Sequence, residues 1–348
     1  PRIDSLDMLR GLMALAVAVY HLGIWNAMTQ IGSRTNTVLA ILGNYGVQGF
    51  FVVSGFCFFF LYRDTRWNGK ALAGFHIKRF FRIAPLYYLA VIANIVLKQP
   101  VVFSTNARML SENATLTFGL FHPNHALVLG GWSIGIEYVF YLALPLLLIL
   151  TRRTWAMALL AIALMAVAWP WTFHWIPAAS HAHDMKFHTY VLVRNHAFLF
   201  LMGGLLARLW MATPRRLSPW VGAGLLLLVA ILVWPRGPVS YDHFEMLVGW
   251  ARVRYVAAFV AAVGIFSFTE LPQTHWRRAL VILGDLSYSV YLLHPFAQLA
   301  SVHLIGTAHP TANFLLGLGL TLALAWVVYQ YLERPAMALG RRLAGKLA

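Results

Sequence analysis

Ten apolar segments follow one another along the chain, separated by short polar stretches. About 20 apolar residues in a helix can cross a bilayer, and several of these segments reach that length. We therefore predict an all-α, polytopic integral membrane bundle of about ten transmembrane helices. Gly43-Asn44-Tyr45-Gly46 favours a turn and predicts an interruption of the second helix. The predicted helices cover residues 8–28, 38–62, 79–97, 132–150, 154–174, 189–210, 218–235, 253–269, 280–305 and 312–333.

Composition supports this assignment. Of the 348 residues, 60% are hydrophobic and only 11% are charged, against about 25% charged residues in ordinary soluble domains. No polar stretch is long enough for a second folded domain, so we expect one membrane domain over residues 1–348. The single cysteine, Cys57, lies in an apolar segment and excludes an intrachain disulfide. The ionisable Arg10 and His21, and the absence of a small-residue cleavage site, indicate that the first helix is not a cleaved signal peptide.

The net charge of +16 indicates membrane topology rather than nucleic-acid binding. No soluble domain carries a basic stripe with interleaved aromatic residues, so we expect no nucleic-acid partner. With the N-terminus inside, 19 of the 27 Lys and Arg residues fall on one side of the predicted bundle and 8 on the other. Basic residues concentrate on the cytoplasmic side, so both termini are predicted to be cytoplasmic.

Arg10 and His21 lie within the first apolar segment. An ionisable side chain in lipid is costly unless it faces a partner or a wet cavity. Eleven residues make three helical turns plus about 20°, so the two side chains share one stripe, about 16 Å apart along the axis. Arg10 alone fits an interfacial arginine whose head reaches water. His21 lies deeper, and an imidazole moves protons near neutral pH, so the pattern favours a functional histidine.

Two further charged motifs allow two interpretations each. Arg79 and Arg82 are three residues apart and share a helical face. Paired guanidinium groups suit phosphates, but the spacing alone favours a basic anchor at lipid headgroups. Glu137 follows Gly131-Trp132-Ser133 at the start of the fourth helix. It fits either a carboxylate that assists a histidine or a first-turn glutamate favoured by the helix dipole.

Asp285 and His294 are nine residues apart, so they face opposite sides of a straight helix and cannot pair unaided. His294 precedes Pro295, and a histidine bonded within a kinked bundle is favoured over a catalytic one. His181-Ala182-His183 has no carboxylate or cysteine at ligand spacing, so we expect no metal. The sequence contains no Walker loop, dinucleotide fingerprint or Gly-x-Ser-x-Gly elbow.

Together these segments resemble the acyltransferase-3 family of bacterial membrane O-acyltransferases, in order and over nearly the whole chain. Two positions depart from the family pattern: Gln48 stands where an acidic residue is frequent, and Gly135 where a bulkier or hydroxyl residue is common. The resemblance rests on Asp7-Met8-Leu9-Arg10-Gly11 with His21, on residues 46–56, on Arg79 and Arg82 with Pro85-Leu86-Tyr87, on residues 132–138, on residues 283–288 and on Glu333-Arg334-Pro335.

The resemblance implies ten core helices and a stand-alone enzyme without an added hydrolase-like domain, located in the bacterial cytoplasmic (inner) membrane. It implies transfer of an acyl group, usually acetyl from acetyl-CoA, to a hydroxyl of a cell-surface or exported glycan. Arg79, Arg82 and Arg10 would bind the phosphates of coenzyme A. His21 would act as general base or accept the acyl group first. Glu137 would orient His21 or stabilise its charged form, and Arg10 belongs to the same catalytic set.

Two other classes of protein fit the same residues. Buried Arg, His, Glu and Asp are also typical of a proton-coupled transporter or flippase of a small molecule or lipid-linked sugar. No inverted repeat is evident, which counts against transport. A binding or scaffold subunit of a polysaccharide machine is the third possibility. Label transfer that depends on coenzyme A would separate the enzyme from both.

Overall fold

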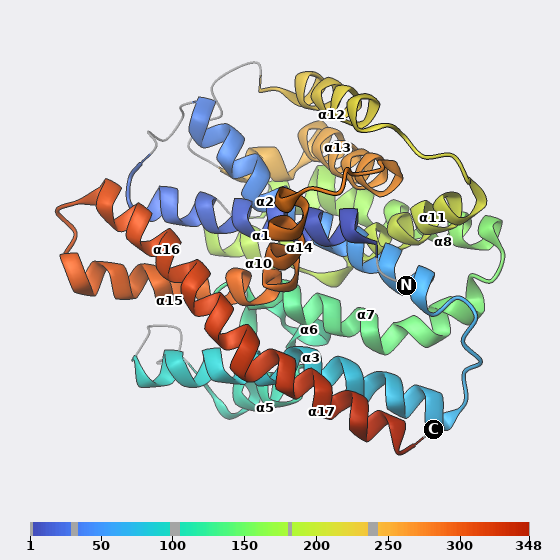
Figure 1. Ribbon diagram of the computed structural model, residues 1–348, viewed down its shortest axis with the longest axis horizontal. Coiled ribbons are helices and arrows are strands. Elements are labelled where there is room, and N and C mark those ends of the chain that lie inside the picture. Colours follow the sequence, from blue (N-terminus) through green and yellow to red (C-terminus); the bar gives the residue numbers. More distant parts are fainter. Residues whose placement is uncertain (1–2, 29–33, 98–104, 180–182, 236–242, 348) are drawn as a thin grey trace.

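The computed structural model describes residues 3–28, 34–97, 105–179, 183–235 and 243–347. These residues fold into helices and contain no strand, apart from one isolated bridge between Leu217 and Thr269. The all-α prediction is therefore confirmed (Figure 1). The main helices are α1 (Asp4–Trp25), α2 (Arg34–Leu61), α3 (Gly69–Val96), α7 (Gly131–Leu150), α8 (Thr154–Pro170), α11 (Ala197–Ala212), α12 (Pro219–Val233), α13 (Gly249–Phe268), α14 (His275–Asp285), α15 (Ser287–Ile305), α16 (Pro310–Val328) and α17 (Arg334–Gly345).

Seven helical stretches among the described residues are long and apolar enough to cross a membrane. An eighth is reached if α14 and α15, bent by 70° at Leu286, form one broken span. Helices α11 and α12 are apolar but shorter. The protein is thus a multi-pass membrane protein, whereas the predicted total of ten spans stays a prediction.

Three predictions about the course of the helices are wrong, and the helix predicted at 79–97 also begins earlier, at Gly69. The second helix is not interrupted at residues 43–46, because α2 runs unbroken through them. Gly43 instead lets the Tyr20 ring of α1 pack against the α2 backbone, where any side chain would collide with it. The helix predicted at 189–210 begins as a continuous α-helix only at Ala197, after a turn and a short 3₁₀ segment. The third error is the bend at Leu286, inside the predicted helix 280–305.

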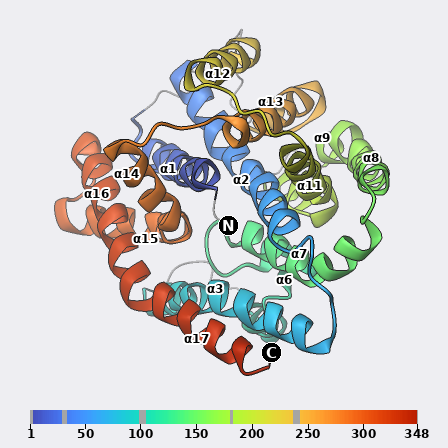
Figure 2. The ribbon, with the colours of Figure 1, turned by 45° about the vertical axis from the view of Figure 1, so that its right-hand side comes forward.

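Helix α1 lies in the interior of the bundle, packed against α2, α13, α14 and α15 (Figure 2). Its central position explains how a helix with polar side chains is kept from lipid. Helices α3 and α17 pack side by side at one edge, and both ends of the described chain lie at the same end of the bundle (Figure 1). This placement agrees with an even number of crossings, while the side of the membrane they occupy remains a prediction.

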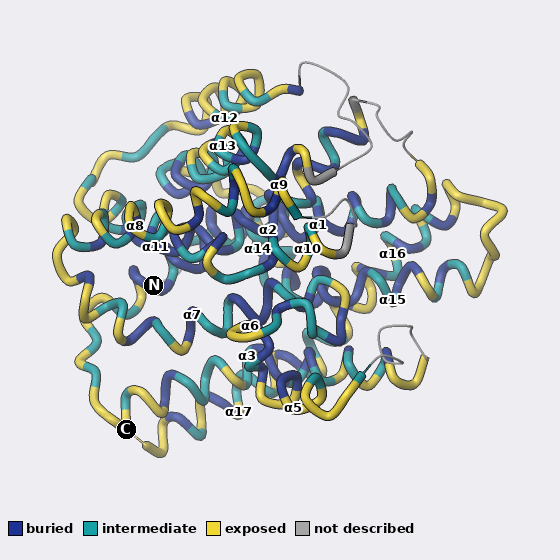
Figure 3. Tube along the Cα trace, turned by 180° about the vertical axis from the view of Figure 1, so that it is seen from behind, coloured by how far each residue is buried: buried dark blue, intermediate teal, exposed yellow. Residues whose placement is uncertain are grey.

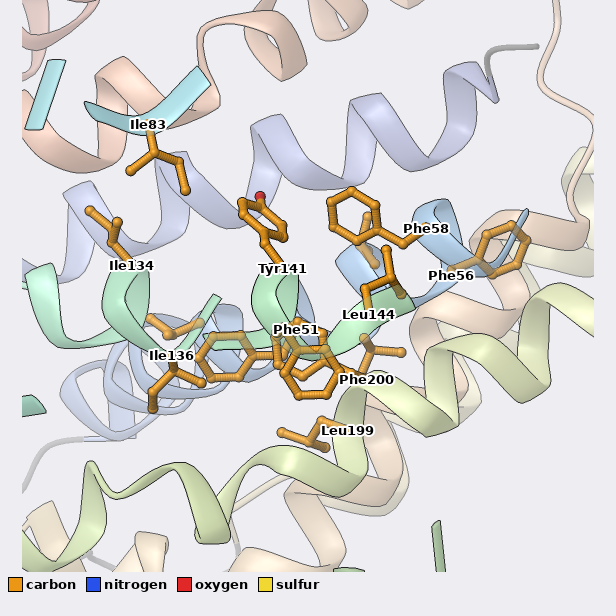
Figure 4. Close-up of a cluster of buried hydrophobic side chains, with 14 of the residues drawn as sticks. Phe51, Phe56, Phe58, Ile83, Ile134, Ile136, Tyr141, Leu144, Leu199 and Phe200 are labelled. Atoms are coloured by element: carbon orange, nitrogen blue, oxygen red, sulfur yellow. The ribbon is translucent and has the colours of Figure 1, made fainter. Parts of the chain in front are cut away.

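The core is aromatic and lies between α2, α7 and α11. Phe51 stacks on Phe200 with ring centroids 5.1 Å apart, and Tyr141 meets Phe58 edge-on at 5.0 Å (Figure 4). Exposed positions concentrate on peripheral helices, above all α12 (Figure 3), whose exposed side chains are almost all apolar. An apolar outer surface around an aromatic core is expected where lipid replaces water as the solvent.

Candidate functional site

His21 lies near the far end of α1, where it stacks on two other rings. Its centroid is 5.1 Å from that of His294 and 5.2 Å from that of Trp25. Its Nδ1 atom lies 3.0 Å from the carbonyl oxygen of Val17. A carbonyl only accepts hydrogen bonds, so Nδ1 carries the proton of the neutral ring and Nε2 carries the lone pair. His21 therefore offers Nε2 as its basic atom.

His294 reaches the same place from α15, directly before Pro295. It is 2% exposed, and its Nδ1 faces the carbonyl of Val290 at 3.3 Å. Its Nε2 is buried and finds no hydrogen-bond partner among the described residues. The bond within its own helix is of the structural kind that the sequence favoured. The contact with His21 has no signal in the sequence, because spacing describes only neighbours on one helix.

The predicted cationic residues gather in a cavity of about 200 Å³ near the start of α1, which we call the arginine cavity. Four sequence-predicted residues line it, together with Asp7, Ser54 and Tyr141. The four are Arg10, Arg79, Arg82 and Glu137. His21 is not among the lining residues, so the structure divides the predicted site into two parts.

Arg79 and Arg82 face the protein interior rather than lipid headgroups. The Arg79 guanidinium lies 4.8 Å from the centre of the Phe58 ring and donates to the Tyr62 hydroxyl at 3.0 Å. Arg82 forms a 2.7 Å ion pair with Glu333, whose side chain is 1% exposed. Glu333 balances the charge of Arg82, whereas Arg79 has no ion pair among the described residues. Arg79 is therefore the better placed of the two to meet an anion.

Glu137 belongs to the arginine cavity. Its Oε1 accepts hydrogen bonds from the Ser54 hydroxyl at 2.9 Å and from the Tyr141 hydroxyl at 2.6 Å. No hydrogen bond joins it to His21 among the described residues. Its predicted role in orienting His21 stays a prediction, and its position favours an action beside Arg10.

A small cavity of about 50 Å³, the tyrosine cavity, continues inward from Arg10 and Glu137 and is also lined by Ser133 and Tyr291. Both hydroxyls lie at hydrogen-bond distance from the carbonyl oxygen of Gly130, at 3.0 Å and 2.9 Å, and 2.9 Å from each other. Gly130 has a φ of +75°, which favours glycine. Ser133 and Tyr291 of this polar triad line the tyrosine cavity, whereas Gly130 does not.

Beyond the triad lies the largest cavity described, of about 560 Å³, which we call the tryptophan cavity. Gly130 borders it, and so does Trp25, whose ring stacks on His21. Its walls combine aliphatic residues with four aromatic rings and three amide side chains. The three cavities thus follow one another from the start of α1 to its end, with His21 beside the last.

A second polar cluster, Glu112, His122 and His125, was not predicted. The two histidine Nδ1 atoms lie 2.9 Å and 2.8 Å from separate oxygens of the Glu112 carboxylate, and Arg108 donates to one of these oxygens at 3.0 Å. These residue types could hold a metal ion. The two imidazole rings are nearly parallel, 15° apart with centroids 4.4 Å apart, and each Nδ1 atom pairs with one oxygen of the same carboxylate. The arrangement is that of a hydrogen-bonded clamp on a carboxylate.

From the sequence, we also expect no metal site at His181-Ala182-His183. Residues 181 and 182 and the side chain of His183 lie outside the described residues. The expectation that the protein holds no metal therefore stays a prediction.

The clamp makes a testable contribution to stability. Burial alone raises the pKa of Glu112, but the hydrogen bonds from His125, Arg108 and His122 outweigh it and lower the pKa. A lowered folded-state pKa stabilises the fold above the unfolded pKa of about 4.3, and this contribution is lost as the pH falls through the folded value. Glu112→Gln should therefore cost about 2 kcal/mol at pH 7 and progressively less below pH 4.3.

Thermal unfolding in detergent at pH 7, 5 and 4 measures this difference. The exposed Glu270→Gln provides the matched control, because no comparable set of donors surrounds this carboxylate among the described residues. A Glu112→Gln deficit that stays constant from pH 7 to below pH 4.3 would contradict the assignment.

Comparison with known proteins shows which family this chain matches. The model of a family described as an acyltransferase domain matches residues 3–330. Nodulation protein 10 of Rhizobium leguminosarum bv. viciae is 24% identical over 99% of this chain and 95% of its own length. Acyltransferase MdmB of Streptomyces mycarofaciens is 24% identical over 98% of this chain and 93% of its own length.

Peptidoglycan O-acetyltransferase OatA of Listeria monocytogenes is also 24% identical, over 96% of this chain. The chain spans only 55% of the length of that relative. No solved structure matches. The family match at residues 3–330 includes every residue that lines the three cavities.

Proposed function

The chain belongs to the acyltransferase domain family, and from that premise we propose that it moves an acetyl group from acetyl-CoA to a hydroxyl of a cell-surface or exported glycan. Membership and the O-acetyltransferase relatives make it an acyltransferase. The donor, the acceptor and a location in the bacterial inner membrane are our proposals. The order of the three cavities along α1, with cations at one end and His21 at the other, carries the proposal.

The arginine cavity suits the phosphorylated end of the donor. Among the described residues the Arg79 guanidinium has no carboxylate partner, and Arg10 lines both the arginine and the tyrosine cavities. Planar guanidinium groups bind phosphate oxygens through paired hydrogen bonds. Basic residues cluster on the side predicted to be cytoplasmic, where acyl-CoA is made. The thioester end of the donor would point along α1 toward the tyrosine cavity.

The transfer then needs one base. The Nε2 atom of His21 takes the proton of the acceptor hydroxyl as its oxygen attacks the thioester carbonyl carbon. The tetrahedral intermediate collapses, the carbon–sulfur bond breaks, and the coenzyme A thiolate takes the proton from His21. Val17 holds the tautomer in which Nε2 is free to do this. Glu137 and Arg10 act at the donor end, where both border the tyrosine cavity.

A direct test is transfer of labelled acetyl from acetyl-CoA by purified protein, followed by mass spectrometry of the glycan product. We expect label in an ester of the glycan and stoichiometric release of coenzyme A. Uptake of a solute into proteoliposomes without acyl-CoA, and no label transfer, would instead favour a transporter and overturn the proposal.

Arg79→Ala should raise the KM for acetyl-CoA about 10-fold or more and change kcat less, because it removes a charge-assisted contact made before and during the reaction. Steady-state kinetics over a range of acetyl-CoA concentrations measures the effect. Lys70→Ala is the control, since Lys70 is an exposed cation on the same helix, outside the cavity. An unchanged KM in Arg79→Ala protein that unfolds like wild type would remove Arg79 from the donor site.

A further inference from the structure

The tryptophan cavity differs from the arginine cavity in charge. None of the described residues that line it is Asp, Glu, Lys, Arg or His, although the chain carries 27 Lys and Arg residues. Five charged side chains line the much smaller arginine cavity: Asp7, Arg10, Arg79, Arg82 and Glu137. The arginine cavity therefore suits an anion, and the tryptophan cavity suits an uncharged molecule.

Four aromatic rings and three amide side chains stand among the aliphatic residues that line the tryptophan cavity. Trp25, Trp132, Phe187 and Phe296 supply the rings. Trp25 is 40% exposed although its ring also packs on His21 and His294. Trp132 meets Phe187 edge-on at 6.3 Å, which fixes the opposite aromatic wall.

The polar groups of this cavity are Asn94, Asn124 and Gln298. Asn94 donates to the carbonyl of Leu127 at 2.7 Å, and Gln298 exchanges two hydrogen bonds with Asn26 at 2.9 Å and 3.0 Å. These bonds hold the Asn94 and Gln298 amides in place. A few fixed polar groups among apolar walls, in a volume between about 300 and 1,000 Å³, are typical of a small-molecule site.

Resting on the proposed function, we propose that the acceptor is an uncharged sugar residue that stacks its apolar C–H face on Trp25 and directs a hydroxyl toward His21. A sugar ring has one face of C–H groups and a rim of hydroxyls, which matches aromatic walls and amide groups. A carboxylate or phosphate on that residue would lose its hydration without a cation to replace it, which is strongly unfavourable. Uronic acids and sugar phosphates are therefore excluded as the residue that accepts the acyl group.

Measurements of sugar binding test the uncharged acceptor without requiring catalytic turnover. Quenching of tryptophan fluorescence in detergent-solubilised protein would be titrated with methyl hexosides of gluco, galacto and manno configuration, and with the uronate matched to each. We expect the best neutral glycoside to bind at least about 10-fold more tightly than its uronate. Equal or tighter binding of the uronate, or no saturable binding of any glycoside, would overturn the proposal.

A substitution that adds a positive charge to the cavity wall tests the same proposal. Leu129→Arg places a cation on the cavity wall and should shift the neutral-to-uronate affinity ratio at least about 10-fold toward the uronate. Phe121→Arg is the control, because Phe121 is exposed outside the cavity, and it should leave the ratio unchanged. Cleavage of acetyl-CoA is measured separately. Its absence would overturn the acyl transfer, whereas cleavage together with preferred uronate binding would overturn only the uncharged acceptor.

Discussion

Replacing His21 by glutamine is expected to lower kcat for acyl transfer by about 10²- to 10⁴-fold, the usual contribution of a general base. Glutamine can keep a hydrogen bond to the carbonyl of Val17 but cannot take a proton. The stacked rings of Trp25 and His294 remain beside it, so we expect normal insertion and thermal unfolding close to that of wild type. Release of coenzyme A at saturating acceptor measures kcat.

His303→Gln is the matched control, since His303 is exposed on α15 outside the described cavities. It should transfer acetyl at the wild-type rate. If His21→Gln protein keeps full activity, His21 has no part in proton transfer. A loss of activity that accompanies a large drop in unfolding temperature would likewise count against a chemical role and assign His21 to packing.

Glu333→Ala is expected to destabilise the protein by about 3–5 kcal/mol, the range for breaking a buried ion pair from one side. The substitution leaves the Arg82 guanidinium buried without its 2.7 Å partner and the Ser289 hydroxyl without its acceptor. Chemical or thermal unfolding in detergent measures the loss, with the exposed Glu270→Ala as control.

The double substitution Arg82→Met with Glu333→Leu separates charge from packing. It removes both charges and keeps apolar volume, so it should recover most of the stability lost in Glu333→Ala. If the double variant is as unstable as the single one, the ion pair does not account for the effect. Because Arg82 also lines the arginine cavity, the double variant should still show a raised KM for acetyl-CoA.

The sequence predicted what depends on local spacing. The apolar segments led to the all-α membrane bundle, and helical periodicity placed Arg79 and Arg82 on one face, where the structure has them lining one cavity. Order along the chain led to the family, which the match over residues 3–330 bears out.

The sequence could not predict contacts between distant helices. His294 meets His21, and Glu333 meets Arg82, only because α15 and the π-helical turn Tyr329–Glu333 pack against α1 and α3. The bend at Leu286 and the unbroken α2 also depend on packing. Turn-forming residues such as Gly43 were interpreted as breaks, although the ring of Tyr20 needs the space that a glycine leaves.

The polar triad of Gly130, Ser133 and Tyr291 has a bioenergetic consequence. A membrane that stores a proton gradient cannot tolerate an open water column from one face to the other. The triad's hydroxyls and carbonyl satisfy one another and lie between the tyrosine and tryptophan cavities. In the proposed transfer, an acetyl group that passes this point changes compartments without opening a water-filled path, so modification of an exterior acceptor would not discharge the membrane.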